Sequence, residues 1–275
     1  MMAAISALLV SFALYHLLFG RLFPWCPVKP GYREVRYEKA ALLLPSRLAI
    51  PRELANIDSV MEDVETFHKL TFKKRVRIIL PETHRDHCRL SGVTAAACAY
   101  ATGTEVFLSL EHVRQAKREP VEILKHELSH AILFQNTSLR NAFRIPEWFR
   151  EGLAIYYGNP HDNYTGDEFI EMAVDRGYLF DLFEPGADLE RIPLEHRYGF
   201  LHSEFRCFME YLVDMFGEDA VTSYAKVLVS DPGREKQAFK EITGADLEEI
   251  AQGFYVEVMA RRWPQAVQRH RAEGD

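Results

Sequence analysis

One run of residues in this chain has types and spacing that suit metal chemistry, His126-Glu127-Leu128-Ser129-His130. On an α-helix, residues four positions apart lie about one turn apart on the same face, so both imidazoles can reach one metal ion. The glutamate beside them is placed to take a proton from an activated water molecule. Zinc prefers a tetrahedral array with one position open for chemistry. The run therefore predicts zinc ligands at His126 and His130, a general base at Glu127, and a third protein ligand elsewhere.

The neighbouring residues favour a helix through this run. Pro120 suits the first helical turn because its missing N–H would find no partner there, and Glu122 suits the positive end of the helix. Apolar residues then recur three and four positions apart and would bury one face: Val121, Leu124, Leu128, Ala131 and Ile132. The alternative is an ordinary helix with two exposed histidines.

Glu151 is the predicted third ligand. It follows His130 by 21 positions, which leaves room for a short loop and an antiparallel second helix that Pro146 can open. Gly152 beside it would permit close approach of the two helix backbones. Glu147, one turn earlier, is the competing carboxylate. A His-His-Glu set would hold one Zn²⁺ ion and leave the fourth position to water.

Two short motifs resemble a known family. The histidine run, followed by the segment Trp-Phe-Arg-Glu-Gly-Leu-Ala at residues 148–154, resembles the gluzincin branch of zinc metallopeptidases. More narrowly, it is similar to the peptidase MA-like group of membrane-anchored bacterial proteins, and weaker likenesses extend over residues 40–255. The resemblance implies that His126, His130 and Glu151 bind zinc, that Glu127 is the general base, and that the substrate is a peptide.

The sequence also departs from better-known relatives. Thermolysin-like enzymes have an aspartate four residues after the glutamate ligand, where it orients a ligating histidine, and here that position is Ile155. The chain has no Gly-x-Met-x-Asn segment of the kind that reads a free amino terminus in large zinc aminopeptidases. The sequence therefore favours metal binding more strongly than it favours peptide hydrolysis.

A hydrolase of this kind also needs a group that stabilises the developing oxyanion, commonly Tyr or His. Tyr198 and His202 are four positions apart and can share one helix face. Similar proteins carry a tyrosine near this place, so Tyr198 is the first choice and His202 the alternative. The other interpretation is a half-buried tyrosine that packs on the next helix.

The amino terminus predicts a membrane anchor. Residues 3–19 are uncharged and mostly apolar, and with Leu22, Phe23 and Trp25 the stretch reaches the lower end of the length that spans a bilayer. A cleaved signal peptide would show a basic leader and small residues at its cleavage point, which are not present. We expect a single-pass transmembrane helix within residues 1–25. A buried first helix of the globular domain is the alternative.

The side of the membrane is left open. No Lys or Arg precedes the apolar stretch and several follow it, which by the positive-inside rule keeps the following domain in the cytoplasm. The family resemblance instead implies a periplasmic or extracellular domain. The four cysteines do not decide between them, because they are too few and too scattered for a disulfide framework or a cysteine-based zinc site.

The order of expected elements predicts an α+β, zincin-like fold: a small mixed β-sheet with N-terminal helices, an active-site helix and a helical C-terminal lobe, after the transmembrane helix. Expected strands are residues 42–44, 75–80, 95–101 and 105–110, and expected helices include 52–69 and 203–216. We expect strand 105–110 to be an exposed edge of the sheet, to which an extended peptide could add as a further strand. The domains expected are an anchor at 1–25, a linker at 26–39, the peptidase domain at 40–260 and a basic tail at 261–275.

Composition limits the partners. The chain is 48% hydrophobic, which supplies ample material for a packed core, and its formal charge of −7 argues against nucleic acid, which needs a concentrated basic surface. We therefore expect a membrane-anchored zinc metallopeptidase, an endopeptidase acting on peptide or protein substrates. The alternatives are a catalytically weak or inactive zincin-like scaffolding protein at the membrane, and a zinc enzyme with a substrate other than a peptide.

Overall fold

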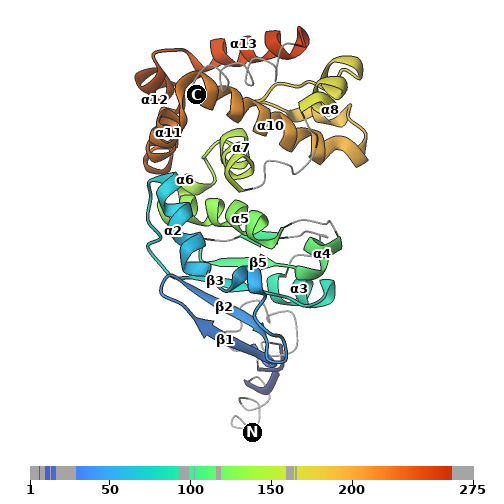
Figure 1. Cartoon of the computed structure of the whole chain (residues 1–275), viewed down its shortest axis with the longest axis vertical. Helices are drawn as coiled ribbons and strands as arrows, with labels where there is room; N and C mark the ends of the chain where they lie inside the picture. Colours follow the sequence, from blue (N-terminus) through green and yellow to red (C-terminus); the bar gives the residue numbers. More distant parts are fainter. Residues whose placement is uncertain are drawn as a thin grey trace. The chain divides into compact units, whose positions relative to one another are not determined.

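The computed structural model describes residues 6, 10–12, 14–16, 29–92, 99–101, 103–115, 119–158, 164 and 166–261. The chain divides into two compact units, of which the first comprises Met1–Asp63 and Phe72–Ala131 and the second comprises Val64–Thr71 and Ile132–Asp275. Figure 1 shows the strands gathered in the first unit, whereas the helices of the second unit pack on one another.

The first unit is built on a five-stranded mixed sheet with the order β1-β2-β3-β5-β4. The pairs β1–β2 and β4–β5 are antiparallel, while β2–β3 and β3–β5 are parallel. Because every residue of β2 is buried, this strand reads as a continuous apolar run. The strands are β1 (Tyr32–Arg36), β2 (Ala40–Pro45), β3 (Val76–Ile79), β4 (Ala99–Ala101) and β5 (Glu105–Leu108).

The helices account for most of the described chain. They are η2 (Arg52–Leu54), α2 (Ile57–His68), α3 (His84–Ser91), α4 (Leu110–Gln115), α5 (Pro120–Gln135), α6 (Leu139–Ala142), α7 (Glu147–Gly158), α8 (Gly166–Ile170), the π-helical turn η3 (Glu171–Asp175), α9 (Gly186–Glu190), α10 (Leu194–Phe216), α11 (Glu218–Ser230), η4 (Pro232–Arg234), α12 (Glu235–Thr243) and α13 (Leu247–Met259). The predicted helix through the histidine run is confirmed, and it begins at Pro120 as expected.

The predicted fold class is wrong. The structure is mostly helical rather than a zincin-like α+β domain behind a membrane anchor, with the small sheet confined to the first unit. The transmembrane helix and the membrane localisation are also wrong, because in the described part of the chain no helix is long and apolar enough to cross a bilayer. Of residues 1–25, only 6, 10–12 and 14–16 are described. An apolar stretch at the lower limit of spanning length does not by itself establish a transmembrane helix.

Several elements also differ from their sequence-based expectations. Strand β5 lies between β3 and β4, so it is not the exposed sheet edge that was expected to bind a peptide. The segment expected as one helix at residues 52–69 is a short 3₁₀ turn followed by α2. Strand β1 lies inside the range expected to be a linker. Of the strand expected at residues 95–101, the part at 95–98 lies outside the described residues.

Helix α3 was not expected at all. It begins at Thr83, whose side-chain oxygen accepts a hydrogen bond from the backbone N–H of Asp86 (3.1 Å), and it ends at Gly92, whose φ of 76° suits glycine. Leu90 packs on the sheet against side chains of three strands, namely Leu43, Ile79 and Phe107. The capping pattern fixes the helix locally, and the buried leucine holds it on the sheet.

The second unit has an aromatic core between helices. Trp148 and Phe149 of α7 and Phe205 and Phe208 of α10 are buried, and the Trp148 ring lies 5.3 Å from that of Phe208. Gly152 lets α7 and α10 approach closely, because a Cβ there would lie only 2.7 Å from the backbone oxygen of Phe205. The glycine beside the predicted ligand Glu151 therefore serves the packing of α7 on α10.

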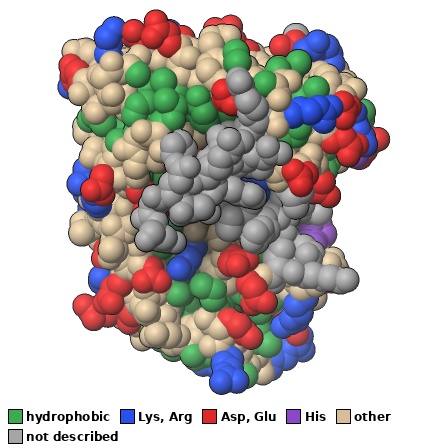
Figure 2. Space-filling model, turned by 45° about the horizontal axis from the view of Figure 1, so that its top comes forward, with side chains coloured by type: hydrophobic (Ala, Val, Ile, Leu, Met, Phe, Trp, Pro, Cys, Tyr) green, Lys and Arg blue, Asp and Glu red, His purple; other side chains and the backbone are tan. Residues whose placement is uncertain are grey.

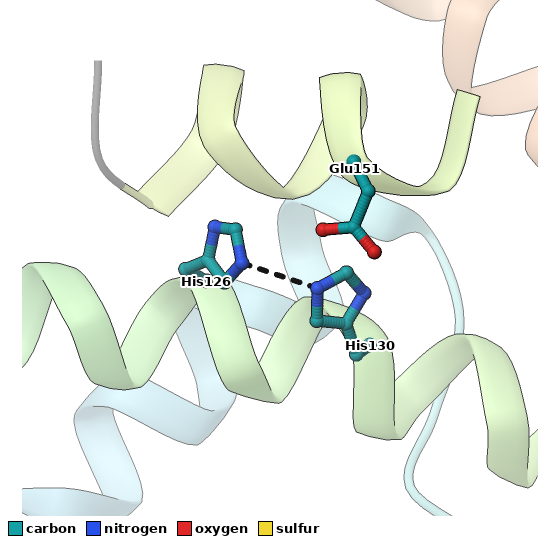
Figure 3. Close-up of side chains that lie close together, drawn as sticks. All are labelled: His126, His130 and Glu151. Atoms are coloured by element: carbon teal, nitrogen blue, oxygen red, sulfur yellow. Dashed lines mark hydrogen bonds between the residues drawn. The ribbon is translucent and has the colours of Figure 1, made fainter. Parts of the chain in front are cut away.

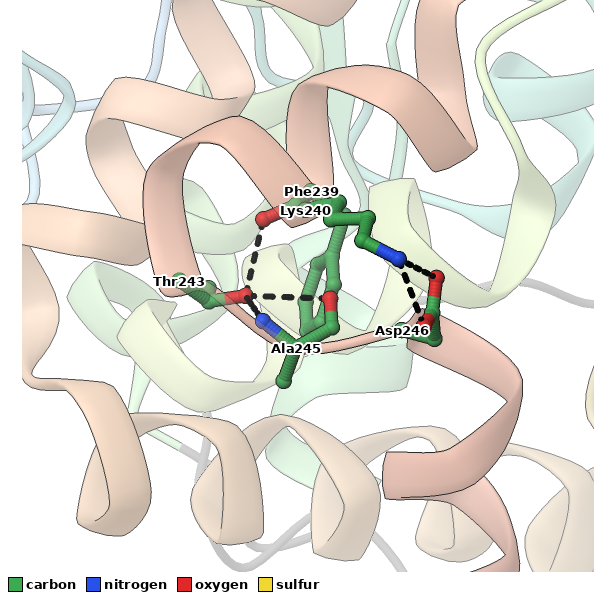
Figure 4. A network of polar contacts seen from close by, with 5 residues as sticks. All are labelled: Phe239, Lys240, Thr243, Ala245 and Asp246. Atoms are coloured by element: carbon green, nitrogen blue, oxygen red, sulfur yellow. Dashed lines mark hydrogen bonds and ion pairs between the residues drawn. The ribbon is translucent and has the colours of Figure 1, made fainter.

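A polar network shapes the turn between α12 and α13 (Figure 4). The Thr243 hydroxyl donates to the carbonyl of Phe239 (2.8 Å) and accepts from the N–H of Ala245 (3.2 Å). Lys240 pairs with Asp246 at 2.9 Å across the same turn. Exposed ion pairs of this kind contribute little to stability, because solvent screens them. The network therefore sets the direction of the chain, while the apolar core supplies most of the stability.

Acidic and basic side chains are interspersed over the described part of the face drawn in Figure 2. Ion pairs among the described residues include Arg47 with Glu82 (2.7 Å) and Arg234 with Glu241 (2.7 Å).

Candidate metal centre

His126 and His130 lie on the same face of helix α5, with their imidazole rings close together. The Nε2 atoms of His126 and His130 lie 3.1 Å apart, and the ring centroids are 4.8 Å apart with the planes nearly perpendicular. Two imidazoles on one tetrahedral zinc ion have their ligating nitrogens about 3.3 Å apart, given Zn–N bonds of about 2.05 Å. The observed spacing of the two nitrogens therefore fits a common ion.

Glu151 of α7 joins this pair. One ligand atom from each of His126, His130 and Glu151 lies within 4.8 Å of the other two. Figure 3 shows the carboxylate directed toward the two imidazole rings. His130 is buried, while His126 and Glu151 are half-buried. Two imidazoles and one carboxylate are the donor set of catalytic zinc sites, so the residues present fit this ion.

Arg150 is a residue of this centre that the sequence reasoning missed. Its guanidinium Nε donates a hydrogen bond to Glu151 Oε1 at 3.2 Å, and both side chains are largely shielded from solvent. A charge-assisted hydrogen bond of this kind orients the carboxylate. The signal was present in the segment Trp-Phe-Arg-Glu-Gly, where the arginine directly precedes the ligand.

Glu127, the predicted general base, is buried, with an exposed fraction of 8%. It lies between the two histidines on the same helix. A buried carboxylate is rare unless it has a partner or a role, and Glu127 makes contacts in the structure. Glu127 directly follows His126 on α5, which is the position predicted for a general base beside the two histidines.

Glu147, the competing ligand, is directed elsewhere. It lines a cavity of about 310 Å³ in the second unit together with Pro146, Trp148 and Phe183. The structure therefore brings Glu151, and not Glu147, together with the two histidines.

The structure does not bring the two candidate oxyanion groups, Tyr198 and His202, to the metal ligands. Tyr198 is 67% exposed near the start of α10, and His202 is half-buried one turn later. Within the described residues, neither makes a hydrogen bond or ring contact with the three ligand side chains. Ile155 is buried, and its aliphatic side chain has no polar atom with which to orient a histidine. The roles of Tyr198 and His202 stay predictions.

No protein-family model matches the sequence, and a search of curated proteins finds no significant relative. The geometry of the three side chains is accordingly the ground for any function assigned to this chain.

Proposed function

We propose that the protein is a zinc-dependent hydrolase that cleaves peptide bonds, with His126, His130 and Glu151 holding one zinc ion and Glu127 acting as the general base. The observation that carries the proposal is the meeting of the three ligand side chains within 4.8 Å. A zinc ion bound there would supply a Lewis acid that lowers the pKa of water and polarises a carbonyl group.

The chain's own groups divide the remaining work. Glu127 accepts a proton from the attacking water and later gives it to the leaving amine. His126 and His130 are fixed by four-residue spacing on a single helix, which preorganises the centre. Arg150 orients the Glu151 carboxylate through the 3.2 Å hydrogen bond. A scaffold that held metal without turnover would have no need of the carboxylate of Glu127.

The test combines metal analysis with an assay of casein or peptide cleavage, with and without a chelator. We expect one zinc equivalent that depends on His126, and cleavage that the chelator abolishes. Glu127→Gln should lower the cleavage rate by about 10²–10⁴-fold, the usual contribution of a general base, and should retain zinc.

Glu122→Gln is the matched control, since Glu122 lies in the first turn of the same helix. It should keep full activity and full zinc content. Full activity in Glu127→Gln would overturn the assignment of the base. Zinc retained by the wild type without cleavage of any peptide would favour a binding protein or a hydrolase of another substrate.

A further inference from the structure

A second set of metal-binding side chains lies in the first unit, on α3. His84, His87 and Cys88 occupy positions i, i+3 and i+4 of this helix and therefore share one face. The Cys88 Sγ atom lies 3.4 Å from His84 Nε2. A thiol and an imidazole on one tetrahedral zinc ion have their ligand atoms about 3.5 Å apart, so this pair already has the spacing of two ligands.

Helix α4 brings a third histidine to the same place. The His112 ring centroid lies 5.0 Å from that of His84, with the planes at 73°. Two imidazoles on one zinc ion have centroids about 5.2 Å apart, from the same bond lengths. Glu111, the residue before His112, accepts a hydrogen bond from the backbone N–H of His84 at 2.9 Å. This bond connects the start of α4 to the start of α3.

His87 supplies an independent observation. Its side chain has an exposed fraction of 0%, yet neither ring nitrogen has a hydrogen-bond partner among the described residues. Leaving a buried polar group unsatisfied costs about 1–3 kcal/mol, so a fully buried imidazole calls for a partner.

We propose that His84, Cys88 and His112 form a second metal site, with His87 as its fourth ligand after a rotation of its side chain. The rotation is needed because the His87 and His84 centroids are 6.5 Å apart, more than the about 5.2 Å that a shared ion requires. One sulfur and three imidazole nitrogens select zinc, cobalt(II) or copper over magnesium or calcium, which prefer oxygen ligands. Binding converts the Cys88 thiol to a thiolate and releases one proton to solvent.

An ion bound at this site would cross-link α3 and α4. These helices flank the strands β4 and β5 in sequence, and α4 precedes α5 in the chain. A closed set of four protein ligands is typical of structural zinc, which adds its binding free energy to the stability of the fold. This second metal site is independent of the centre on α5, which contains no sulfur ligand.

Cobalt(II) titration of the metal-free full-length protein separates the two sites. A thiolate bound to cobalt(II) gives an intense charge-transfer absorption, which only a site that contains cysteine can produce. We expect two cobalt equivalents and this band in the wild type. Cys88→Ser should lose the band and one equivalent, while His126→Ala should lose one equivalent and keep the band.

Cys207→Ala is the matched control, because Cys207 is buried in α10 and outside this cluster, and it should keep the band. A second readout covers variants that fold poorly: bound zinc should slow alkylation of Cys88 in the wild type by at least about 10-fold. A wild-type protein without the band and without this protection would overturn the proposal. A band that persists in Cys88→Ser would also overturn it, by assigning the thiolate to another cysteine.

Discussion

Two helices of the first unit carry histidines on one face, and they differ in how completely the side chains converge. On α5, His126 and His130 have their Nε2 atoms 3.1 Å apart and share a common point with Glu151. On α3, the pair of Cys88 and His84 is equally close, but among the described residues only the α5 set has three ligand atoms within 4.8 Å of one another. The first arrangement is preorganised, and the second needs a side-chain rotation to close.

The two sets differ in the number of protein ligands that they offer to an ion. The α5 set offers three protein ligands, and in the proposed hydrolase the fourth position would be taken by water. The α3 set offers four protein ligands, one of them fully buried, which suits an ion that stays in place. Preorganisation matters most where chemistry depends on geometry, whereas a structural ion contributes its binding energy as it draws ligands together.

Removal of a ligand from the preorganised set should have the largest effect. His126→Ala leaves one histidine and one carboxylate, too few for a catalytic zinc site, so we expect zinc affinity at α5 to fall by more than about 100-fold, beyond the loss of a second-shell contact. Peptide cleavage should fall to the level of chelator-treated protein. Metal analysis and the cleavage assay measure both effects.

His196→Ala is the control for that substitution, because His196 pairs with the Tyr164 hydroxyl (2.8 Å) and belongs to neither cluster. It should retain both metals. Equal loss of zinc in the two variants would show that any lost histidine destabilises the chain, and the contrast between α5 and α3 would then disappear.

The third ligand gives a slightly smaller effect. Glu151→Gln keeps the shape of the side chain but removes the negative charge that binds the ion and pairs with Arg150. We expect zinc affinity and cleavage to fall by about 100-fold. Glu147→Gln, one turn earlier on α7, should change both by less than about 2-fold, because Glu147 lines a separate cavity. If the Glu147 variant lost the zinc instead, the ligand assignment from the structure would be wrong.

The two sites also differ in how far the sequence revealed them. The α5 pair was predictable because both histidines and the base lie in one helix, where spacing determines which side chains share a face. Glu151 was found only through the neighbouring motif, since spacing alone allowed Glu147 as well. The α3 set was missed because no helix was expected at residues 84–91. His112 also belongs to a different helix, α4, which only the tertiary fold brings next to α3.

Tertiary organisation explains the other failures. The sequence contained strong strand signals at residues 75–80 and 105–110, but the parallel pairing of β3 with β5 is a long-range contact that no local pattern encodes. The expected peptide-binding edge was wrong for that reason. Gly152 was expected to let the second helix approach the histidine helix closely, but the backbone it faces is that of α10, about fifty residues further along the sequence.

Close packing at Gly152 should affect the two sites unequally. An alanine there gains about 1 kcal/mol of helix propensity, but its Cβ would lie 2.7 Å from the backbone oxygen of Phe205, which cannot move without shifting α10. We expect a net loss of about 2 kcal/mol in the free energy of unfolding, measured by denaturant titration, with weaker zinc binding by Glu151 and an unchanged thiolate–cobalt band.

Gly253→Ala is the control, since its Cβ would meet only the hydroxyl end of Tyr211 at 3.1 Å, which a flexible side chain can relieve. Its stability should stay within about 1 kcal/mol of the wild type. A Gly152→Ala protein of wild-type stability would show that the contact of α7 with α10 is looser than the structure has it.

The smallest expected effect concerns the contact that ties α3 to α4. Glu111→Ala removes the acceptor for the His84 N–H but leaves all four proposed ligands in place. Partners that position ligands typically contribute 10–100-fold to metal affinity, and an acceptor that acts through the backbone belongs at the lower end, so we expect cobalt(II) to bind about 10-fold more weakly at the thiolate site. Glu82→Ala removes a nearby carboxylate that pairs with exposed Arg47, and it should leave the affinity unchanged. If Glu111→Ala bound cobalt(II) as tightly as the wild type, packing alone would hold α3 and α4 in register, and the hydrogen bond from His84 would contribute nothing to the second site.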